Sequence, residues 1–264
     1  MSALPNPAAG PTAGRATGPA RRALRGVLPP LLLLAAWQAA STGGLADPRL
    51  LPPLERVAAA AWTQLTAGNL RDSLLRDLGG FALGASAGLG LGLLLGLSPL
   101  AGRLLRPSFD ALKGIAVFAW IPLIAIWFGF GEASKLAFIA LAAFTPVVLN
   151  VDEGVRGVPA PLREVAAALA WTPWQRLTRL VLPAALPSIL TGLQLGLIHA
   201  WLATVGAEYF LAKGSGLGGV LIEGRDRFDM AQVLLGVLLL GGVGYALNRL
   251  ADLAARRLTR WRTA

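Results

Sequence analysis

The sequence predicts an all-α membrane protein with about six transmembrane helices, and three observations support this fold class. Of its 264 residues 55% are hydrophobic and only 14% are charged, and the mean hydropathy of +0.61 exceeds that of a water-soluble domain. A hydrocarbon core about 30 Å thick needs roughly 20 mostly apolar residues per helix. Strand-like alternation is absent, so helices must satisfy the backbone inside lipid. There are six apolar runs, free of Asp, Glu, Lys and Arg except for Glu208 in the fifth: Val27–Ala40, Gly79–Leu97, Ile115–Phe130, Leu136–Val151, Ser188–Leu211 and Ala231–Leu247.

The first run has two interpretations. It follows Arg21, Arg22 and Arg25 and is shorter than the others, so it is either a membrane span or the apolar part of a cleaved secretory signal. Residues 1–26 contain many Pro, Ala and Gly and predict a disordered cytoplasmic tail, and residues 27–264 predict a single transmembrane domain.

The positive charges predict the orientation in the membrane. With six spans and a cytoplasmic N-terminus, 16 of the 24 Lys and Arg residues fall on the cytoplasmic side, which fits the positive-inside rule. We therefore expect a multi-pass protein of the bacterial inner membrane with both termini in the cytoplasm. The net charge of +10 does not indicate nucleic-acid binding, because the basic residues flank the spans, where lipid headgroups account for them.

Two further segments predict helices with packing faces. In Leu50–Asp77 an apolar side chain recurs every four residues from Val57, which indicates an amphipathic helix on the outer surface. In the second span five glycines are each four residues apart, the extended form of the small-residue motif that allows close helix contact. They are Gly80, Gly84, Gly88, Gly92 and Gly96, and the sequence does not identify the helix they contact.

The longest cytoplasmic segment, residues 152–187, is too apolar and too regular for a flexible linker. It predicts a short helix over Pro161–Ala170, a break at Trp171–Pro173, and a second helix over Trp174–Leu182 that ends before Pro183. The segment reads Glu-Val-Ala-Ala-Ala-Leu-Ala-Trp-Thr-Pro-Trp from Glu164, followed by Leu-Pro at Leu182.

This segment resembles the cytoplasmic EAA loop of binding-protein-dependent ATP-binding-cassette permeases, and the resemblance extends over most of the chain. It includes the glycine-rich second span and an ordered set of shorter segments typical of the nitrate, sulfonate and taurine branch. These are Ala119–Leu123, Trp127–Gly129, Pro146, Asn150, Ala200–Trp201, Ala207–Glu208 and Gly214–Gly218. Two positions depart from the family pattern: Ala170 replaces the loop glycine, and Val117 and Phe118 replace a pair of prolines.

The resemblance implies a type I importer permease, without an active site of its own, that forms a homodimer. Its partners would be an ATP-binding subunit, which holds ATP and Mg, and an extracytoplasmic substrate-binding protein. The short loop helix would dock on the ATPase, since a stiff helix transmits displacement, small side chains allow close approach, and tryptophans anchor interfaces. The alternative is an amphipathic helix at the membrane interface, with its tryptophans at the level of the headgroups. The coupling residues are Glu164, Ala166, Ala167, Ala170, Trp171, Thr172 and Trp174.

Other chemistry is excluded by the sequence. There is no phosphate-binding Gly-x-x-x-x-Gly-Lys-Ser/Thr loop, so the ATPase must be another chain. The absence of cysteine excludes thiolate metal sites and a cysteine nucleophile, and no metal or catalytic residues are assigned. Gly214–Gly216 resembles part of a serine nucleophile motif, but the sole His199 lies in another run and a polar turn is the better interpretation.

Three residues are candidates for the translocation path or gate. His199 and Glu208 are ionisable groups inside the fifth run, where burial of charge is costly. They are nine residues apart, so on a helix they point about 180° from each other and do not form a direct acid–base pair. We expect Glu208 to pair with a neighbour or shape an outer gate, and His199 and Trp120 either line the path or pack in the core.

The sequence therefore predicts a permease that imports a small anion, first an alkanesulfonate or taurine and then nitrate or bicarbonate. One alternative is a transporter driven by an ion gradient, which would show inverted repeats and more ionisable groups at the midplane. The other is a membrane-embedded enzyme, which would need a converging nucleophile, base and metal ligands.

Overall fold

The computed structural model describes residues 19–45, 47–66, 68–211 and 214–259, and within these ranges every regular element is a helix. The predicted all-α fold class is confirmed. The chain divides into two compact units, residues 1–54 and 55–264.

The first unit consists of α1 (Pro19–Thr42) and the segment that follows it. This segment folds back on the helix: Trp37 Nε1 donates to Pro52 O at 2.9 Å and Ser41 Oγ donates to Leu51 O at 2.8 Å. The helix begins at Pro19, before the predicted start at Val27, and residues 1–18 of the predicted tail lie outside the described residues.

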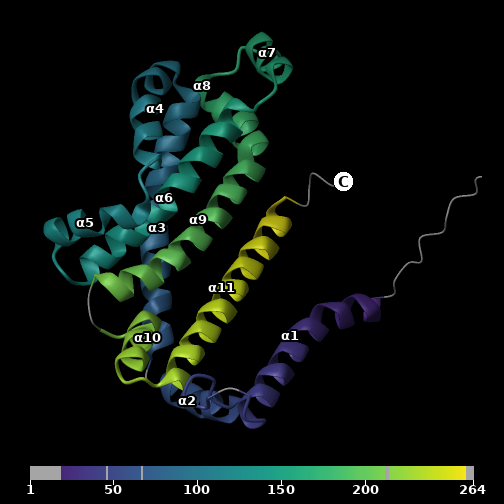
Figure 1. Ribbon diagram of the computed structural model, residues 1–264. Coiled ribbons are helices and arrows are strands. Elements are labelled where there is room, and N and C mark those ends of the chain that lie inside the picture. The colour runs from purple at the N-terminus through teal and green to yellow at the C-terminus, as the bar shows by residue number, and fades with distance from the viewer. Residues whose placement is uncertain (1–18, 46, 67, 212–213, 260–264) are drawn as a thin grey trace, which may run out of the picture. The chain divides into compact units, whose positions relative to one another are not determined.

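The second unit contains four helices long and apolar enough to cross a membrane (Figure 1). They are α3 (Asn69–Leu97), α6 (Glu132–Arg156), the continuous segment Pro173–Phe210, and α11 (Met230–Leu258). The predicted helix of the Leu50–Asp77 segment is α2 (Leu54–Thr66), in which Val57 is buried and Ala61 is half-buried.

The third predicted span is not one straight helix. Residues Pro99–Lys113 form α4, residues Val117–Trp120 form the 3-10 helix η1, and residues Ile121–Phe128 form α5, with a bend of 93° between α4 and the η1–α5 pair. The bend arises because Ala116, between α4 and η1, has an extended backbone, and Pro122 lies beyond the bend, in the first turn of α5, where a missing N–H is tolerated. The described residues thus contain four candidate spans, or five if this bent pair is one span, and the predicted count of six is not confirmed.

The second helix predicted for the segment 152–187 also differs from the prediction. It does not end before Pro183, because α8 (Pro173–Arg176), a π-helical segment η2 (Leu177–Val181) and α9 (Leu182–Phe210) follow without a break. Pro183 lies in the first turn of α9, directly after the π turn has already shifted the hydrogen-bond ladder, so its missing N–H costs little.

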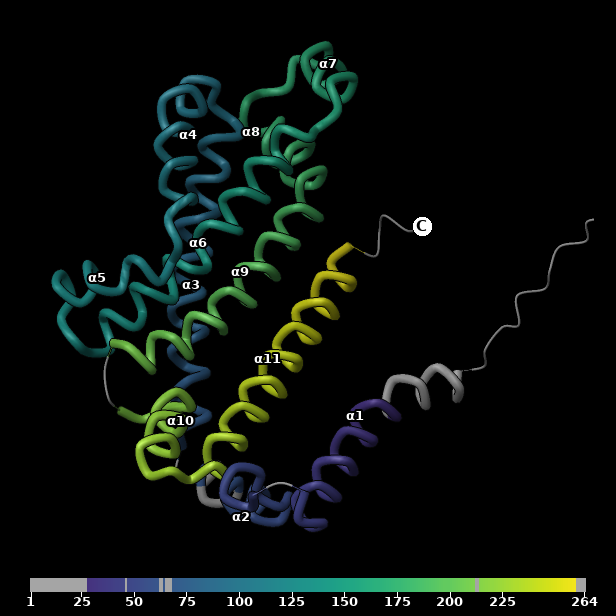
Figure 2. Tube along the Cα trace, in the orientation of Figure 1, coloured from purple at the N-terminus to yellow at the C-terminus, as the bar shows by residue number. Residues whose placement is uncertain are grey.

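Helix α6 is the centre of this unit. Half of the residues in the most apolar stretch of α6 are buried, whereas only 17% are buried in the corresponding stretch of α11. Helix α6 packs on both α3 and α9. Its buried side chains join those of α9 in one apolar cluster around Phe138 and Ala143, and those of α3 and α9 in a second around Val147 and Val151. Figure 2 shows α7 (Ala160–Ala168) and α8 at one end of the unit and α10 (Leu217–Asp226), a helix the sequence did not predict, at the opposite end.

Candidate functional site

The five glycines of α3 form a flat face against α6. A Cβ atom on Gly84 would lie 2.1 Å from the carbonyl oxygen of Ala140, and one on Gly92 would lie 2.6 Å from Cβ of Val151. Gly80, Gly88 and Gly96 meet Ile139, Val147 and Val155 in the same way. The partner that the sequence could not name is therefore α6, and the two helices are held at a separation that only glycine permits.

The loop predicted to be cytoplasmic begins with α7, which ends in a Schellman motif. Trp171 N donates to Ala166 O at 3.1 Å, and Ala170 N donates to Ala167 O at 2.9 Å. In this motif the residue after the helix adopts the left-handed conformation, and Ala170 does so with a φ of 51°. The structure thus gives a reason for the glycine that the resemblance predicts here, because alanine in this left-handed conformation costs about 1–2 kcal/mol.

The turn between α7 and α8 is fixed by a reciprocal cap. Thr172 Oγ1 accepts from Gln175 N at 3.2 Å, while Thr172 N donates to Gln175 Oε1 at 2.9 Å. Arg176 Nε also donates to Trp171 O at 3.0 Å. Thr172, a predicted coupling residue, therefore lies at the start of α8 and fixes the direction of that helix.

Arg163 ties the loop helix to the end of α6, a role that the sequence analysis missed. Its guanidinium donates to Val158 O at 2.6 and 2.9 Å and to Arg156 O at 2.9 Å. These carbonyls follow or end α6, where helix geometry leaves them without intrahelical partners. The sequence feature that could have predicted this contact is a basic residue shortly after the end of a helix.

One face of the loop is exposed and apolar. Ala166 is buried against the rest of the chain, whereas Glu164 and Ala167 are exposed. Trp174 is 70% exposed, and three further apolar residues outside the predicted set are at least 47% exposed: Leu162, Val165 and Leu169. In water, an apolar surface of this kind marks a site for a partner.

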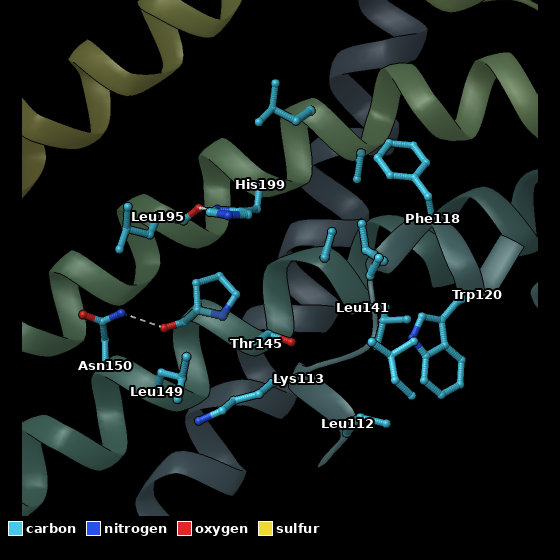
Figure 3. A pocket seen from close by; sticks show the side chains of 17 residues that line it. Leu112, Lys113, Phe118, Trp120, Leu141, Thr145, Leu149, Asn150, Leu195 and His199 are labelled. Atoms are coloured by element: carbon cyan, nitrogen blue, oxygen red, sulfur yellow. Dashed lines mark hydrogen bonds between the residues drawn. The ribbon is translucent and has the colours of Figure 1, made fainter. Parts of the chain in front are cut away.

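Trp120 and His199 lie on the wall of one cavity of about 570 Å³ between the end of α4, η1, α6 and α9 (Figure 3). The same wall carries Lys113, Thr145 and Asn150, none of which the sequence analysis assigned to the path. His199 Nδ1–H donates to Leu195 O at 2.8 Å, one turn earlier on α9, which fixes the orientation of the ring.

Phe118, at one of the two positions where the resemblance predicts proline, lines this cavity. Its ring lies 5.6 Å from that of Phe138 and 6.3 Å from that of Phe210, measured between centroids. A Cβ on Gly206 would lie 2.7 Å from Phe118, so the ring rests directly on α9. The aromatic side chain thus joins η1, α6 and α9.

Glu208 lies outside the cavity, in a buried polar network at the end of the unit opposite the loop. Arg76 Nη1 donates to Glu208 Oε1 at 2.8 Å, and Arg76 also contacts both carboxylate oxygens of Glu132, at 2.6 and 2.9 Å. Ser73 Oγ donates to Glu208 Oε1 at 2.7 Å, and Gly218 N donates to Glu208 Oε2 at 2.8 Å. The structure therefore separates Glu208 from His199, as their nine-residue spacing predicts.

The same network accounts for the Gly214–Gly216 turn. Arg76 donates to Ser215 O at 2.5 Å and to Ser215 Oγ at 3.1 Å, so this serine accepts hydrogen bonds that position the turn before α10. Asp77, also buried and also missed, accepts from Thr204 Oγ1 of α9 at 3.4 Å. These hydrogen bonds join residues more than 120 positions apart in the chain. The sequence around either residue therefore does not predict its partner.

Comparison with known proteins identifies relatives over most of the chain. Residues 88–263 match the family described as binding-protein-dependent transport system inner membrane component. The chain is 37% identical to the putative aliphatic sulfonates transport permease SsuC of Bacillus subtilis, over 91% of this chain and 88% of that protein. It is 32% identical to the taurine transport system permease TauC of Escherichia coli, over 87% and 86% of the two chains.

The fold has a solved counterpart. A chain of the MetNI methionine ABC transporter, in an inward-facing conformation, superposes with a TM-score of 0.65 and covers 74% of this chain and 96% of its own length. The two sequences are 20% identical, so this similarity concerns the fold alone.

Proposed function

Because the chain belongs to the family of binding-protein-dependent transport system inner membrane components, we propose that it is the permease subunit of an importer for a small organic anion. Aliphatic sulfonates and taurine are the first candidates, since permeases named for these solutes align over most of the chain. Nitrate and bicarbonate are the next candidates. ATP hydrolysis belongs to a separate subunit, which would bind ATP and Mg.

The observation that carries the coupling part of the proposal is the rigid, exposed apolar face of the α7–α8 loop. Leu162, Val165, Leu169 and Trp174 are exposed, although Arg163 and the Thr172–Gln175 cap hold the loop in one conformation. A preorganised apolar surface loses little conformational entropy when it binds. We assign this face, together with Glu164, Ala167 and Trp171, to the contact with the ATPase.

One continuous helical segment connects the loop to the cavity and to the buried network, so a displacement of the loop would move both of these sites. Residues Pro173–Phe210 are continuous, and this segment carries His199 in the cavity wall and Glu208 in the buried network. Because 38 helical residues span about 57 Å, the rod extends beyond a hydrocarbon core of about 30 Å. Closure of an ATPase dimer would thus tilt α9, and the cavity would change its access in a two-state transition.

The assembly and orientation are also part of the proposal. The permease would be a homodimer that receives solute from an extracytoplasmic binding protein, with both termini in the cytoplasm. In this orientation the α7–α8 loop faces the ATPase, and α10 and the Arg76–Glu208 network face the binding protein. Residues 1–26 would be the cytoplasmic tail and the remainder a single permease domain.

The decisive experiment measures ATP hydrolysis in liposomes that contain this chain and the ATPase encoded beside it, with and without solute-loaded binding protein. We expect stimulation by the loaded binding protein, and we expect Glu164→Lys to abolish it while the permease remains folded. ATPase association is also measured without binding protein, and there Glu223→Lys, which reverses an exposed carboxylate on α10 at the other end of the unit, is the matched control. A wild-type chain that neither assembles with the ATPase nor changes its turnover would overturn the importer and favour a gradient-driven transporter.

A further inference from the structure

The cavity between α4, η1, α6 and α9 has the chemistry of a binding site for an amphiphilic anion. Its volume of about 570 Å³ is sufficient for a small organic molecule. Polar groups and aromatic groups lie on different parts of its wall. Figure 3 shows Lys113, Thr145 and Asn150 on one side and Phe118 and Trp120 toward the other.

The polar side favours negative charge. Lys113 is the one Lys or Arg residue on the cavity wall as the structure describes it, and no Asp or Glu residue lines that wall. The Lys113 ammonium is paired at 2.7 Å with Asp110, one turn earlier on α4 and outside the lining, so two of its three protons remain available. An anion bound here would therefore share the ammonium with Asp110, whose carboxylate lies outside the wall and offsets part of its charge.

Neutral donors complete this side. Asn150 Nδ2 donates to Pro146 O at 2.8 Å, which uses one of its two amide protons. Within the described residues the half-buried Thr145 hydroxyl has no hydrogen-bond partner. A tetrahedral oxyanion has several acceptor oxygens, and the wall offers three kinds of donor to them: an ammonium from α4, and an amide and a hydroxyl from α6.

The apolar side favours a carbon chain on the same ligand. Phe118 and Trp120 form an apolar surface together with Leu141 and Leu202. A bare inorganic anion has no apolar part to cover this surface, which would stay in contact with water or lipid. Burial of each methylene group of a ligand against such a wall contributes about 0.8 kcal/mol. The two halves of the wall therefore fit a molecule with a charged head and a short aliphatic tail.

We propose that this cavity is a subsite of the permease for aliphatic oxyanions, in which Lys113 binds the anionic group and the Phe118–Trp120 wall binds the carbon chain. The inference rests on the proposed function and adds to it a selectivity step inside the membrane. After its release from the binding protein, the solute would be selected a second time, for its negative charge and for an apolar tail.

The test measures direct binding to the permease–ATPase complex in lipid nanodiscs without binding protein, with 1-butanesulfonate as the probe. Butan-1-ol, butylammonium and nitrate are the comparison ligands. We expect saturable binding of butanesulfonate, about tenfold weaker binding for Lys113→Gln, and a change within about threefold for Lys113→Arg, since a charge-assisted hydrogen bond corresponds to roughly a factor of ten or more. Arg103→Gln removes a charge from the same helix outside the cavity and should leave the affinity unchanged.

Trp120→Ala is the independent variant, because it should weaken the binding of butanesulfonate several-fold and leave that of nitrate unchanged. Equal affinity of Lys113→Gln and the wild type, equal losses in Lys113→Gln and Arg103→Gln, or equal binding of butanol and butanesulfonate would each overturn the inference. A wild-type complex that responds to loaded binding protein but does not bind butanesulfonate overturns this inference alone. A complex without that response overturns the proposed function instead.

Discussion

Arg76 on α3 and Glu208 on α9 form a buried ion pair of 2.8 Å between side chains that are 132 residues apart. Only 2% of the Glu208 side chain and 11% of the Arg76 side chain is exposed. Through Glu132 the pair reaches α6, and through Gly218 N it reaches the start of α10. One guanidinium and one carboxylate therefore join four helices at the end of the unit opposite the α7–α8 loop.

Glu208→Gln should lower the free energy of unfolding by about 3 kcal/mol, because it leaves a buried guanidinium without one of its two carboxylates. We therefore expect reduced stability as well as reduced uptake, although Glu208 lies outside the cavity. The measurement is chemical or thermal unfolding of the purified permease. Glu223→Gln, which breaks an exposed pair with Arg227, should change stability by less than about 1 kcal/mol.

A double-mutant cycle with Arg76→Met and Glu208→Leu tests the pairing itself. The loss in the double variant should be smaller than the summed losses of the single variants, since removal of both charges leaves no unpaired ion. Additive losses would contradict a direct interaction between these two side chains.

Gly84→Ala should destabilise the α3–α6 pair by about 1–3 kcal/mol, because the new methyl group would lie 2.1 Å from the Ala140 carbonyl oxygen and backbone cannot move aside like a side chain. Gly90→Ala is the matched control on the same helix, where a Cβ meets nothing within 4 Å, and it should be neutral or slightly stabilising. Unfolding in detergent compares the two variants. Equal behaviour would mean that the glycine face does not set the distance between the helices.

Hydropathy predicts α3, α6, α9 and α11 because each contains a long run without charge, which only a helix can place in lipid. It does not predict the 93° bend after α4, since Gly114–Ala116 is as apolar as its neighbours and the bend depends on backbone conformation. Helix α10 was missed because it is short and mixes glycines with charged residues, and it takes its position from contacts with α9 and α11.

The candidate sites divide in the same way. The candidate coupling loop could be named from the sequence because its motif is continuous in the chain, whereas the partners of Glu208 come from α3 and the start of α10. Similarly, Trp120 and His199 were named separately, but their common cavity with Lys113 exists only once α4, α6 and α9 are packed. Family resemblance indicated a glycine at position 170, and only the φ of 51° shows why.

Ala170→Gly should stabilise the α7–α8 loop by about 1 kcal/mol, because glycine adopts the left-handed conformation without the Cβ clash that alanine carries. Amide hydrogen exchange of α7 should slow about fivefold as a result. Ala168→Gly, two residues earlier in the last helical position, should have the opposite effect, since glycine weakens a helix by about 0.5–1 kcal/mol. If both substitutions accelerate exchange, the left-handed turn at Ala170 is not a source of strain.

Trp174→Ala should weaken association with the ATPase about 30-fold while the permease alone keeps its unfolding free energy within about 1 kcal/mol. Trp174 is 70% exposed, so most of its surface makes no contact within the chain and is accessible to a partner. Arg163 and the Thr172–Gln175 cap already fix the loop that carries it. The measurement is binding of the ATPase to the permease in nanodiscs. Trp127→Ala, which truncates a 64% exposed tryptophan on α5 away from the loop, should leave that affinity unchanged. Equal affinities of the two variants would contradict the coupling role of Trp174, because the loss would then reflect truncation of any exposed tryptophan rather than of this contact.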